Sequence, residues 1–255
     1  MPAPVNQTPP DEVDGLRARL GFWLRNDASR LLWPARCLIC GESAEDARDL
    51  CRACAAALPW NQVACDRCAL PLAAPGTCGA CLRRPPPLAT VHAACRYGFP
   101  LDRLLLRFKF HHDLTAGRLL SQLMAEACTP LPRPDAVIPI PLHRARLRHR
   151  GYDQALELAR PLARALSLPL LDNALLRVRA TRAQSELDAA TRRRNLRNAF
   201  AVDVPAVLRA RQVLPRHVVL VDDVMTTGAT LHAAATALLR VGVQRVDAWV
   251  CARVP

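Results

Sequence analysis

The sequence lacks any uncharged apolar run of about 18 residues, so it predicts no transmembrane helix. The first residues, MPAPVNQTPPDEVD, contain neither a basic start nor an apolar stretch, so they do not fit a secretory signal. They are rich in proline and polar residues, a composition typical of a disordered tail. We therefore expect a cytoplasmic protein.

Lysine is almost absent, because Lys109 is the one lysine among 35 basic residues and all the others are arginine. An ammonium group is not interchangeable with a guanidinium group, so a role in a binding site is one explanation for Lys109 and chance is the other. The formal net charge of +13 favours anionic partners such as phosphates or nucleic acid.

Three regions of different composition follow one another along the 255 residues. We expect a tail and a docking helix at 1–33, a cysteine-rich module with a Pro-rich linker at 34–87, and a larger domain at 88–255. In the larger domain, apolar runs of strand length alternate with segments of helical periodicity. This alternation is typical of an α/β fold with a mainly parallel sheet flanked by helices.

Eight of the 11 cysteines form four CxxC pairs, and two such pairs complete one tetrahedral zinc site. Disulfides are disfavoured in a cytoplasmic chain, and a redox dithiol needs one CxxC pair rather than four. We expect two closed, structural zinc ions; consecutive pairing of the CxxC pairs is simplest, and a crossed pairing stays open. The expected ligands are Cys37, Cys40, Cys51, Cys54, Cys65, Cys68, Cys78 and Cys81, whereas Cys95, Cys128 and Cys251 lie in apolar runs typical of a core.

The segment VVLVDDVMTTGATL, at 218–231, reads as a buried strand, two carboxylates, a loop of small and hydroxylated residues, and a helix. Backbone N–H groups and a helix N-terminus bind anions, so we expect a phosphate site formed by Thr226, Thr227, Gly228, Ala229 and Thr230. Asp222 and Asp223 suit a sugar attached to that phosphate, since carboxylates accept hydrogen bonds from hydroxyls and stabilise a cationic sugar transition state. The absence of Gly-Lys-Ser/Thr excludes a Walker loop, and a simple threonine N-cap is the alternative.

The adjacency of the two acids carries a geometric expectation. Neighbouring side chains of an extended strand point to opposite faces. Both carboxylates reach one sugar only if the strand ends at Asp222, and we therefore predict a turn at Asp223.

Two basic segments are candidates for binding a diphosphate. HRARLRHR, at 143–150, follows an apolar strand, and bidentate arginines suit pyrophosphate; a solvated helix start is the alternative. The segment at 177–200 holds seven arginines and reads as a long, mobile loop that closes as a lid, with a nucleic-acid contact surface as a compatible alternative. From these segments we expect site roles for Arg144, Arg148, Arg150, Gln184, Arg192 and Arg194, together with Lys109.

These motifs resemble a known family. VVLVDDVMTTGAT is similar to the phosphoribosyl-pyrophosphate motif of type I phosphoribosyltransferases. Together with the cysteine module, FKFHHD and PIPLHRARLRHRGYDQA, it resembles the ComF family, which includes GntX and competence-associated DNA-uptake proteins. The resemblance covers about residues 31–255 and departs from the family pattern at Asp153, where Asn is usual, and at His112, where Gly is usual.

The resemblance implies ligands and roles. Asp222 and Asp223 would hold the ribose 2′ and 3′ hydroxyls, the Thr-rich loop the 5′-phosphate, and Lys109 matches the family's Lys-Phe position. The implied substrate is phosphoribosyl pyrophosphate with magnesium on its diphosphate, and the acceptor is unknown. The alternative is a non-enzymatic protein of the DNA-uptake machinery that binds a nucleotide or single-stranded DNA.

Overall fold

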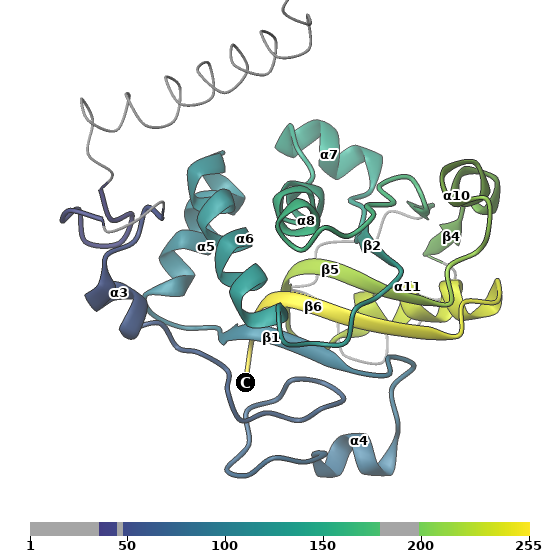
Figure 1. Ribbon diagram of the computed structural model, residues 1–255, viewed down its shortest axis with the longest axis horizontal. Coiled ribbons are helices and arrows are strands. Elements are labelled where there is room, and N and C mark those ends of the chain that lie inside the picture. The colour runs from purple at the N-terminus through teal and green to yellow at the C-terminus, as the bar shows by residue number, and fades with distance from the viewer. Residues whose placement is uncertain (1–35, 45–47, 179–198) are drawn as a thin grey trace, which may run out of the picture. The chain divides into compact units, whose positions relative to one another are not determined.

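The computed structural model describes residues 36–44, 48–178 and 199–255 (Figure 1). The chain divides into two compact units, Met1–Ala55 and Ala56–Pro255. The second four-cysteine group therefore belongs to the same compact unit as the sheet. The domain boundaries expected at 33/34 and 87/88 remain predictions.

In the first unit, the described residues form the first cysteine module. Arg36 and Ser43 make an isolated antiparallel bridge around the first CxxC turn, and the amide of Leu38 donates to the carbonyl of Asp49. The short helix α3 (Arg52–Ala56) begins beside the second CxxC pair. These contacts bring the two CxxC turns together.

The second unit contains a four-stranded sheet in the order β1-β6-β5-β2, with every pairing parallel. Its strands are almost wholly buried, as expected for apolar runs that are covered on both faces. The α/β fold class is confirmed. The strands are β1 (Val91–Arg96), β2 (Ala136–Pro139), β5 (His217–Met225) and β6 (Arg245–Arg253).

Helices cover both faces of this sheet (Figure 1). On one face, α6 and α8 pack on the strands and α5 packs on α6, and α11 packs on the other face. Among the described residues, the further helices of this unit are α4 (Gly79–Arg83), α5 (Leu101–Phe110), α6 (Leu114–Cys128), α7 (Arg144–Arg150), α8 (Gln154–Ala165), α10 (Val204–Arg211) and α11 (Ala229–Arg240). None of the helices in the described part of the chain has both the length and the apolarity that crossing a bilayer requires.

A small antiparallel pair, β3 (Leu175–Arg177) with β4 (Phe200–Val202), brackets the segment expected to form a basic lid. Of the predicted lid, at 177–200, residues 179–198 lie outside the described residues, and with them Gln184, Arg192 and Arg194. Arg177 pairs with Phe200 across the small sheet, so the first and last residues of the predicted lid lie side by side in strands rather than in a loop.

The outer edge of β1 is covered by the chain that leads into the second cysteine group. The amide of Arg96 donates to the carbonyl of Pro59 at 2.7 Å, and the amide of Val91 donates to the carbonyl of Asp66 at 3.1 Å. The amide of Asn61 donates to the carbonyl of Ala94 at 3.1 Å. This edge strand therefore has backbone partners on both sides.

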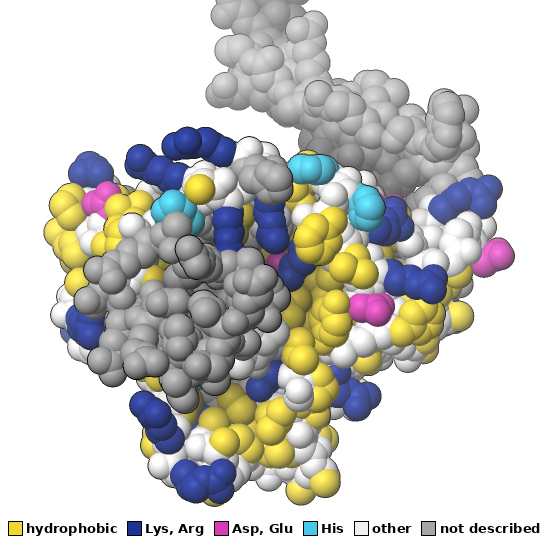
Figure 2. All heavy atoms as spheres, turned by 180° about the vertical axis from the view of Figure 1, so that it is seen from behind, with side chains coloured by type: hydrophobic (Ala, Val, Ile, Leu, Met, Phe, Trp, Pro, Cys, Tyr) yellow, Lys and Arg dark blue, Asp and Glu magenta, His cyan; other side chains and the backbone are white. Residues whose placement is uncertain are grey.

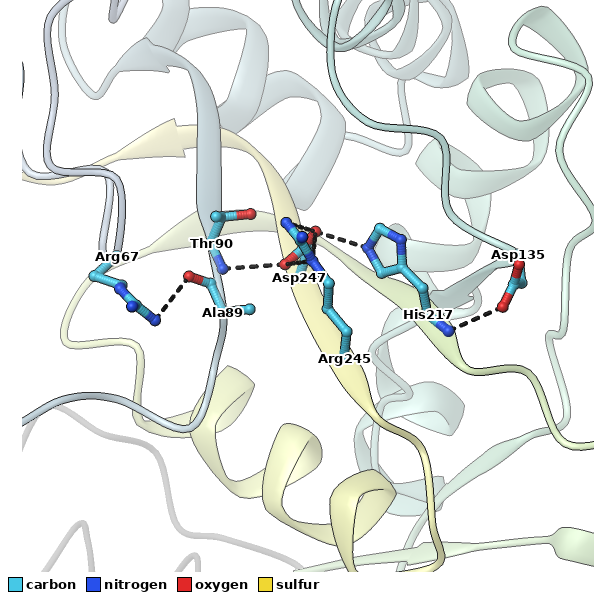
Figure 3. Close-up of polar contacts among 7 residues, drawn as sticks. All are labelled: Arg67, Ala89, Thr90, Asp135, His217, Arg245 and Asp247. Atoms are coloured by element: carbon cyan, nitrogen blue, oxygen red, sulfur yellow. Dashed lines mark hydrogen bonds and ion pairs between the residues drawn. The ribbon is translucent and has the colours of Figure 1, made fainter.

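The amino ends of the strands are joined by a polar cluster around Asp247, which is only 5% exposed (Figure 3). Its carboxylate accepts hydrogen bonds from the amide of Thr90 at 3.1 Å and from Nε2 of His217 at 2.7 Å, and it pairs with Arg245 at 3.0 Å. Asp135 accepts from the amide of His217 at 2.9 Å. The cluster fixes β1, β2, β5 and β6 at the edge opposite the acidic pair.

Candidate functional site

The strand β5 carries both acids, but it does not end where the sequence led us to expect. It continues to Met225, and Asp222 and Val224 are in register with Val250 and Ala252 of β6. The predicted turn at Asp223 is therefore wrong. The physical reason is the length of β6, which supplies backbone partners as far as Arg253.

Each carboxylate caps the amide that follows it. Oδ1 of Asp222 accepts from the amide of Asp223 at 2.9 Å, and Oδ1 of Asp223 accepts from the amide of Val224 at 2.6 Å. The other oxygen of Asp223 lies 2.9 Å from Nζ of Lys109 on α5. The lysine and the second acid form an ion pair that is mostly shielded, with side chains 21% and 12% exposed. Lys109 is thus placed at the acidic pair.

The pKa of Asp222 is raised to about 7, first by burial and then by the neighbouring charge of Asp223. The hydrogen bond from the amide of Asp223 and the ammonium of Lys109 act in the opposite direction. Proximity to Asp153 raises it as well. Two adjacent carboxylates with different environments are a common arrangement at functional sites.

Asp153, where the family has Asn, serves as a hydrogen-bond acceptor with both oxygens. Oδ1 accepts from the amide of Leu156 at 3.2 Å and caps α8, and Oδ2 accepts from the amide of Leu142 at 2.8 Å. Burial raises the pKa of this carboxyl group, and the backbone hydrogen bonds partly offset the effect. These contacts need acceptors only, so an aspartate fulfils them without the donor that an asparagine would add.

His112, where the family has Gly, adopts a left-handed backbone conformation with φ of 55° between α5 and α6. This conformation is uncommon for residues with a side chain. The His112 ring packs on Tyr152 with centroids 5.4 Å apart, and Tyr152 packs on Phe108 at 5.7 Å. The turn beside Lys109 is therefore retained, and an aromatic stack holds its side chain.

The loop after β5 has the geometry expected of an anion site. Gly228 is the N-cap of α11 with φ of 74°, and a Cβ atom there would collide with Cε of Met225 and lie 3.1 Å from Nε2 of His232. Thr226 and Thr227 are exposed, and their hydroxyls have no hydrogen-bond partner among the described residues. The start of α11 thus offers a turn with no room for a side chain, beside unused donors.

The basic segment 143–150 forms α7, capped by His143, whose Nδ1 accepts from the amide of Ala145 at 3.2 Å. Arg144 and Arg148 are exposed, and the guanidinium of Arg150 lies 5.7 Å from the ring centroid of Phe110. The helix follows β2, a direct neighbour of β5. A role for these arginines in binding diphosphate stays a prediction.

Sequence reasoning missed Arg177, the last residue of β3. Burial lowers the pKa of its guanidinium, Arg146 lowers it further, and Asp222 and Asp153 act in the opposite direction. Its guanidinium lies 5.5 Å from the ring centroid of Phe200. The signal in the sequence is the strand-like LLR at 175–177, whose last residue is also the first residue of the predicted loop.

Both four-cysteine groups fit zinc. Within each group the four sulfur atoms lie within 4.8 Å of one another, and the pairing of CxxC turns is consecutive rather than crossed. The Sγ atoms of Cys40 and Cys51, and those of Cys68 and Cys78, are 3.7 Å apart, close to the roughly 3.8 Å that a tetrahedron with Zn–S bonds of about 2.3 Å requires. The amide of Cys78 donates to Sγ of Cys65 at 3.3 Å, as amides commonly do to metal-bound thiolates.

Comparisons with known proteins find matches for both the cysteine-rich part of the chain and the part that contains β5 and α11. A family model described as a double zinc ribbon domain matches residues 28–82, and one described as a phosphoribosyl transferase domain matches residues 153–255. The chain is 38% identical to the DNA utilization protein YhgH of Salmonella typhi over 211 residues, which cover 80% of this chain and 90% of that protein. It is 38% identical to competence protein F of Haemophilus influenzae over 183 residues, which cover 69% and 78%.

Proposed function

This chain belongs to the ComF family, which joins a double zinc ribbon to a phosphoribosyl transferase domain, and we propose that it binds phosphoribosyl pyrophosphate where β5 ends. The observation that carries the proposal is a single strand–loop–helix unit. It presents Asp222 and Asp223, then the loop around Gly228, then the start of α11.

The 5′-phosphate would bind at the loop, where backbone N–H groups and the hydroxyls of Thr226, Thr227 and Thr230 surround an anion. Gly228 allows the left-handed turn, with φ of 74°, that leads the loop into α11. The helix N-terminus adds partial positive charge. A phosphate is therefore the ligand group that this loop suits best.

The ribose hydroxyls would be held by the two carboxylates, which are separated from the loop by Val224 and Met225 of β5. Both acids lie in the extended strand, so their side chains leave it on opposite faces. Without the turn that we predicted at Asp223, the two carboxylates would reach one ribose only if the sugar lay across the end of the strand, with one hydroxyl toward each face. Their charges would also stabilise the positive charge that develops on a ribose ring as its C1 substituent leaves. Of the two acids, Asp223 is the one that forms an ion pair with Lys109.

Lys109 would turn from Asp223 to the diphosphate when the substrate binds. An ammonium beside both the ribose and the departing pyrophosphate would stabilise the charge on the leaving group. Magnesium, which suits oxygen ligands and substrate phosphates, would neutralise that diphosphate when bound with it. Arg144, Arg148 and Arg150 at the same edge, and Gln184, Arg192 and Arg194 of the predicted lid, would complete the basic surroundings.

The reaction would be displacement of pyrophosphate by an acceptor, through an oxocarbenium-like transition state. The relatives are named for DNA utilization and competence, and the acceptor would take part in the same process here. Each of the two four-cysteine groups would hold one structural zinc ion. The protein would act in the cytoplasm.

A second candidate function is binding of single-stranded DNA, in the manner of an accessory protein of DNA uptake. Phe99 and Phe110 flank the two ends of α5 and are 65% and 60% exposed. Arg103 lies 5.0 Å from the Phe99 ring centroid, as Arg150 lies over Phe110. Exposed aromatic rings with arginines on them are what stacking on nucleobases uses.

Calorimetry with magnesium and phosphoribosyl pyrophosphate tests the first candidate. Asp222→Asn and Asp223→Asn should each weaken binding about ten- to a hundredfold, the cost of a charge-assisted hydrogen bond. The exposed Asp172→Asn is the matched control and should bind as the wild type does. Absence of wild-type binding would remove the proposal. If phosphoribosyl pyrophosphate binds but no pyrophosphate is released, the protein binds this ligand without catalysing its reaction. If the wild type binds oligothymidylate and Phe110→Ala does not, the second candidate function is favoured.

A further inference from the structure

The turn of the third CxxC pair, at 65–70, packs on the sheet of the second unit. Its Ala69 is only 1% exposed and belongs to the main hydrophobic core. The carbonyl of Ala69 accepts from Nδ2 of Asn61 at 2.9 Å, and Nη1 of Arg67 donates to the carbonyl of Ala89 at 3.1 Å (Figure 3). The second four-cysteine group is therefore in direct contact with the domain that carries the acidic pair.

The backbone of this turn has a shape that bound metal would stabilise. The amide of Ala69 donates to the carbonyl of Cys65 at 2.8 Å, and Ala69 has a left-handed φ of 54°. This conformation is uncommon for a residue with a Cβ atom. Two sulfur atoms bound to one zinc ion would hold the turn closed, whereas free thiols would not. Zinc in the second group would therefore fix the position of the carbonyl of Cys68.

Arg253, the last residue of β6, connects this turn to the strand that carries the acids. Its Nε donates to the carbonyl of Cys68 at 2.9 Å, and its Nη1 donates to the carbonyl of Met225 at 3.3 Å. The same Nη1 also donates to the carbonyl of Val254. Because a guanidinium presents its donors in a rigid plane, the carbonyls of Cys68 and Met225 are held at fixed positions relative to each other.

Met225 leads into the phosphate loop, the segment at 226–230. It is the last residue of β5 and is 2% exposed. Its Cε lies beside Gly228, since a Cβ atom on that glycine would collide with it. Its carbonyl also accepts from the amide of Val254 at 3.0 Å. The position of Met225 therefore affects both the start of the loop and the turn at Gly228.

We propose that Arg253 is a positioning residue through which zinc in the second four-cysteine group holds the phosphate loop in its binding conformation. This inference rests on the proposed function, since it takes the loop as the site of the 5′-phosphate. Zinc in the first group has no such role, because its cysteines belong to the other compact unit. The affinity for phosphoribosyl pyrophosphate therefore depends on one of the two zinc ions.

Hydrogen exchange of the full-length protein, measured by mass spectrometry, tests this coupling without any ligand. In Arg253→Met and in Cys78→Ser, peptides that cover 224–232 should exchange at least about tenfold faster, and the increase should exceed that in α6. Arg96→Met is the matched control for the arginine, because Arg96 is exposed and is in register with Arg253 on the neighbouring strand. Cys37→Ser is the matched control for the zinc ion. Both controls should exchange as the wild type does in these peptides.

The double variant Arg253→Met with Cys78→Ser distinguishes a shared connection from two separate structural effects. If zinc acts on the loop through Arg253, the loop peptides of the double variant should exchange no faster than those of the faster single variant. Independent effects that multiply would overturn the inference. A rise of equal size in α6 and in the loop would also overturn it, because it would mean that the whole unit is destabilised.

Calorimetry with magnesium and phosphoribosyl pyrophosphate separates this inference from the proposed function. Arg253→Met and Cys78→Ser should each weaken binding at least about tenfold, and Arg96→Met and Cys37→Ser should not. If the wild type does not bind, the proposed function fails, and the exchange of the loop peptides still decides whether zinc acts on the loop. If the wild type binds and neither Arg253→Met nor Cys78→Ser changes exchange or affinity, the proposed function stands and the role of Arg253 is overturned.

Discussion

Nζ of Lys109 lies 2.9 Å from a carboxylate oxygen of Asp223, across the space between α5 and the end of β5. The one lysine of the chain therefore forms an ion pair with one of the two adjacent acids. Its pairing lowers the electrostatic cost of placing two carboxylates side by side. The ammonium group of Lys109 also lies where the diphosphate of the proposed substrate would bind.

Replacing this lysine should impair ligand binding more than folding. We expect Lys109→Met to weaken calorimetric binding of magnesium and phosphoribosyl pyrophosphate at least about tenfold, since it removes a charge-assisted contact. Arg103→Met, on the same helix, is the matched control. Unchanged affinity in Lys109→Met would show that the lysine pairs with Asp223 in the free protein but makes no contact that contributes to ligand binding.

The raised pKa of Asp222 makes a prediction about stability. An acid whose pKa rises from 3.8 to about 7 on folding is more often protonated in the folded than in the unfolded chain between those values. Stability should therefore fall as pH rises from about 4 to 7. Asp222→Asn removes this ionisation and should raise the free energy of unfolding at pH 8 by roughly 1 to 3 kcal/mol. Denaturant unfolding at pH 5 and pH 8 measures it, and an equal effect at both values would contradict the assignment.

Asp153 should affect the pH at which Asp222 ionises. Its charge contributes to the raised pKa of Asp222, and Asn retains an oxygen to cap α8. We expect Asp153→Asn to shift the acid limb of the pH dependence of ligand binding towards lower pH. Titration of binding affinity from pH 5 to pH 9 tests this. A shift towards higher pH would mean that Asp153 acts through structure instead.

The left-handed turn at Gly228 should tolerate no side chain. Gly228→Ala places Cβ against Met225 in a conformation with φ of 74°, so it should abolish ligand binding and destabilise the protein by about 1–3 kcal/mol. Gly98→Ala, where a Cβ meets nothing within 4 Å, is the control. Melting temperature and calorimetry distinguish the two variants. Full affinity in Gly228→Ala would show that the loop is not a phosphate site.

The two zinc sites should differ in what they support. Cys37→Ser and Cys78→Ser should each remove one of two zinc ions, measured by elemental analysis. Because the second group belongs to the compact unit with the sheet, Cys78→Ser should also lower the melting temperature of that unit. Cys37→Ser should leave its melting nearly unchanged. Equal destabilisation by both variants would contradict this division.

Local patterns in the sequence were enough to predict the parallel sheet, the start of α11 at the phosphate loop and the two four-cysteine groups. Each depends on neighbours within about a dozen residues. The turn at Asp223 was mispredicted because the end of β5 is decided by β6, a strand more than 20 residues away. The ion pair of Lys109 with Asp223 joins two segments that are far apart in the sequence, so no local pattern predicts it.

The segment that pairs with the outer edge of β1 limits where the chain can be cut to give a soluble fragment. A fragment that begins after the proline linker, at 88, would lose Pro59, Asn61 and Asp66, and with them the backbone partners of Val91, Ala94 and Arg96. An open strand edge of this kind pairs readily with other chains. Expression of residues 88–255 alone should therefore yield aggregates, whereas a fragment that begins at Ala56 keeps the edge closed.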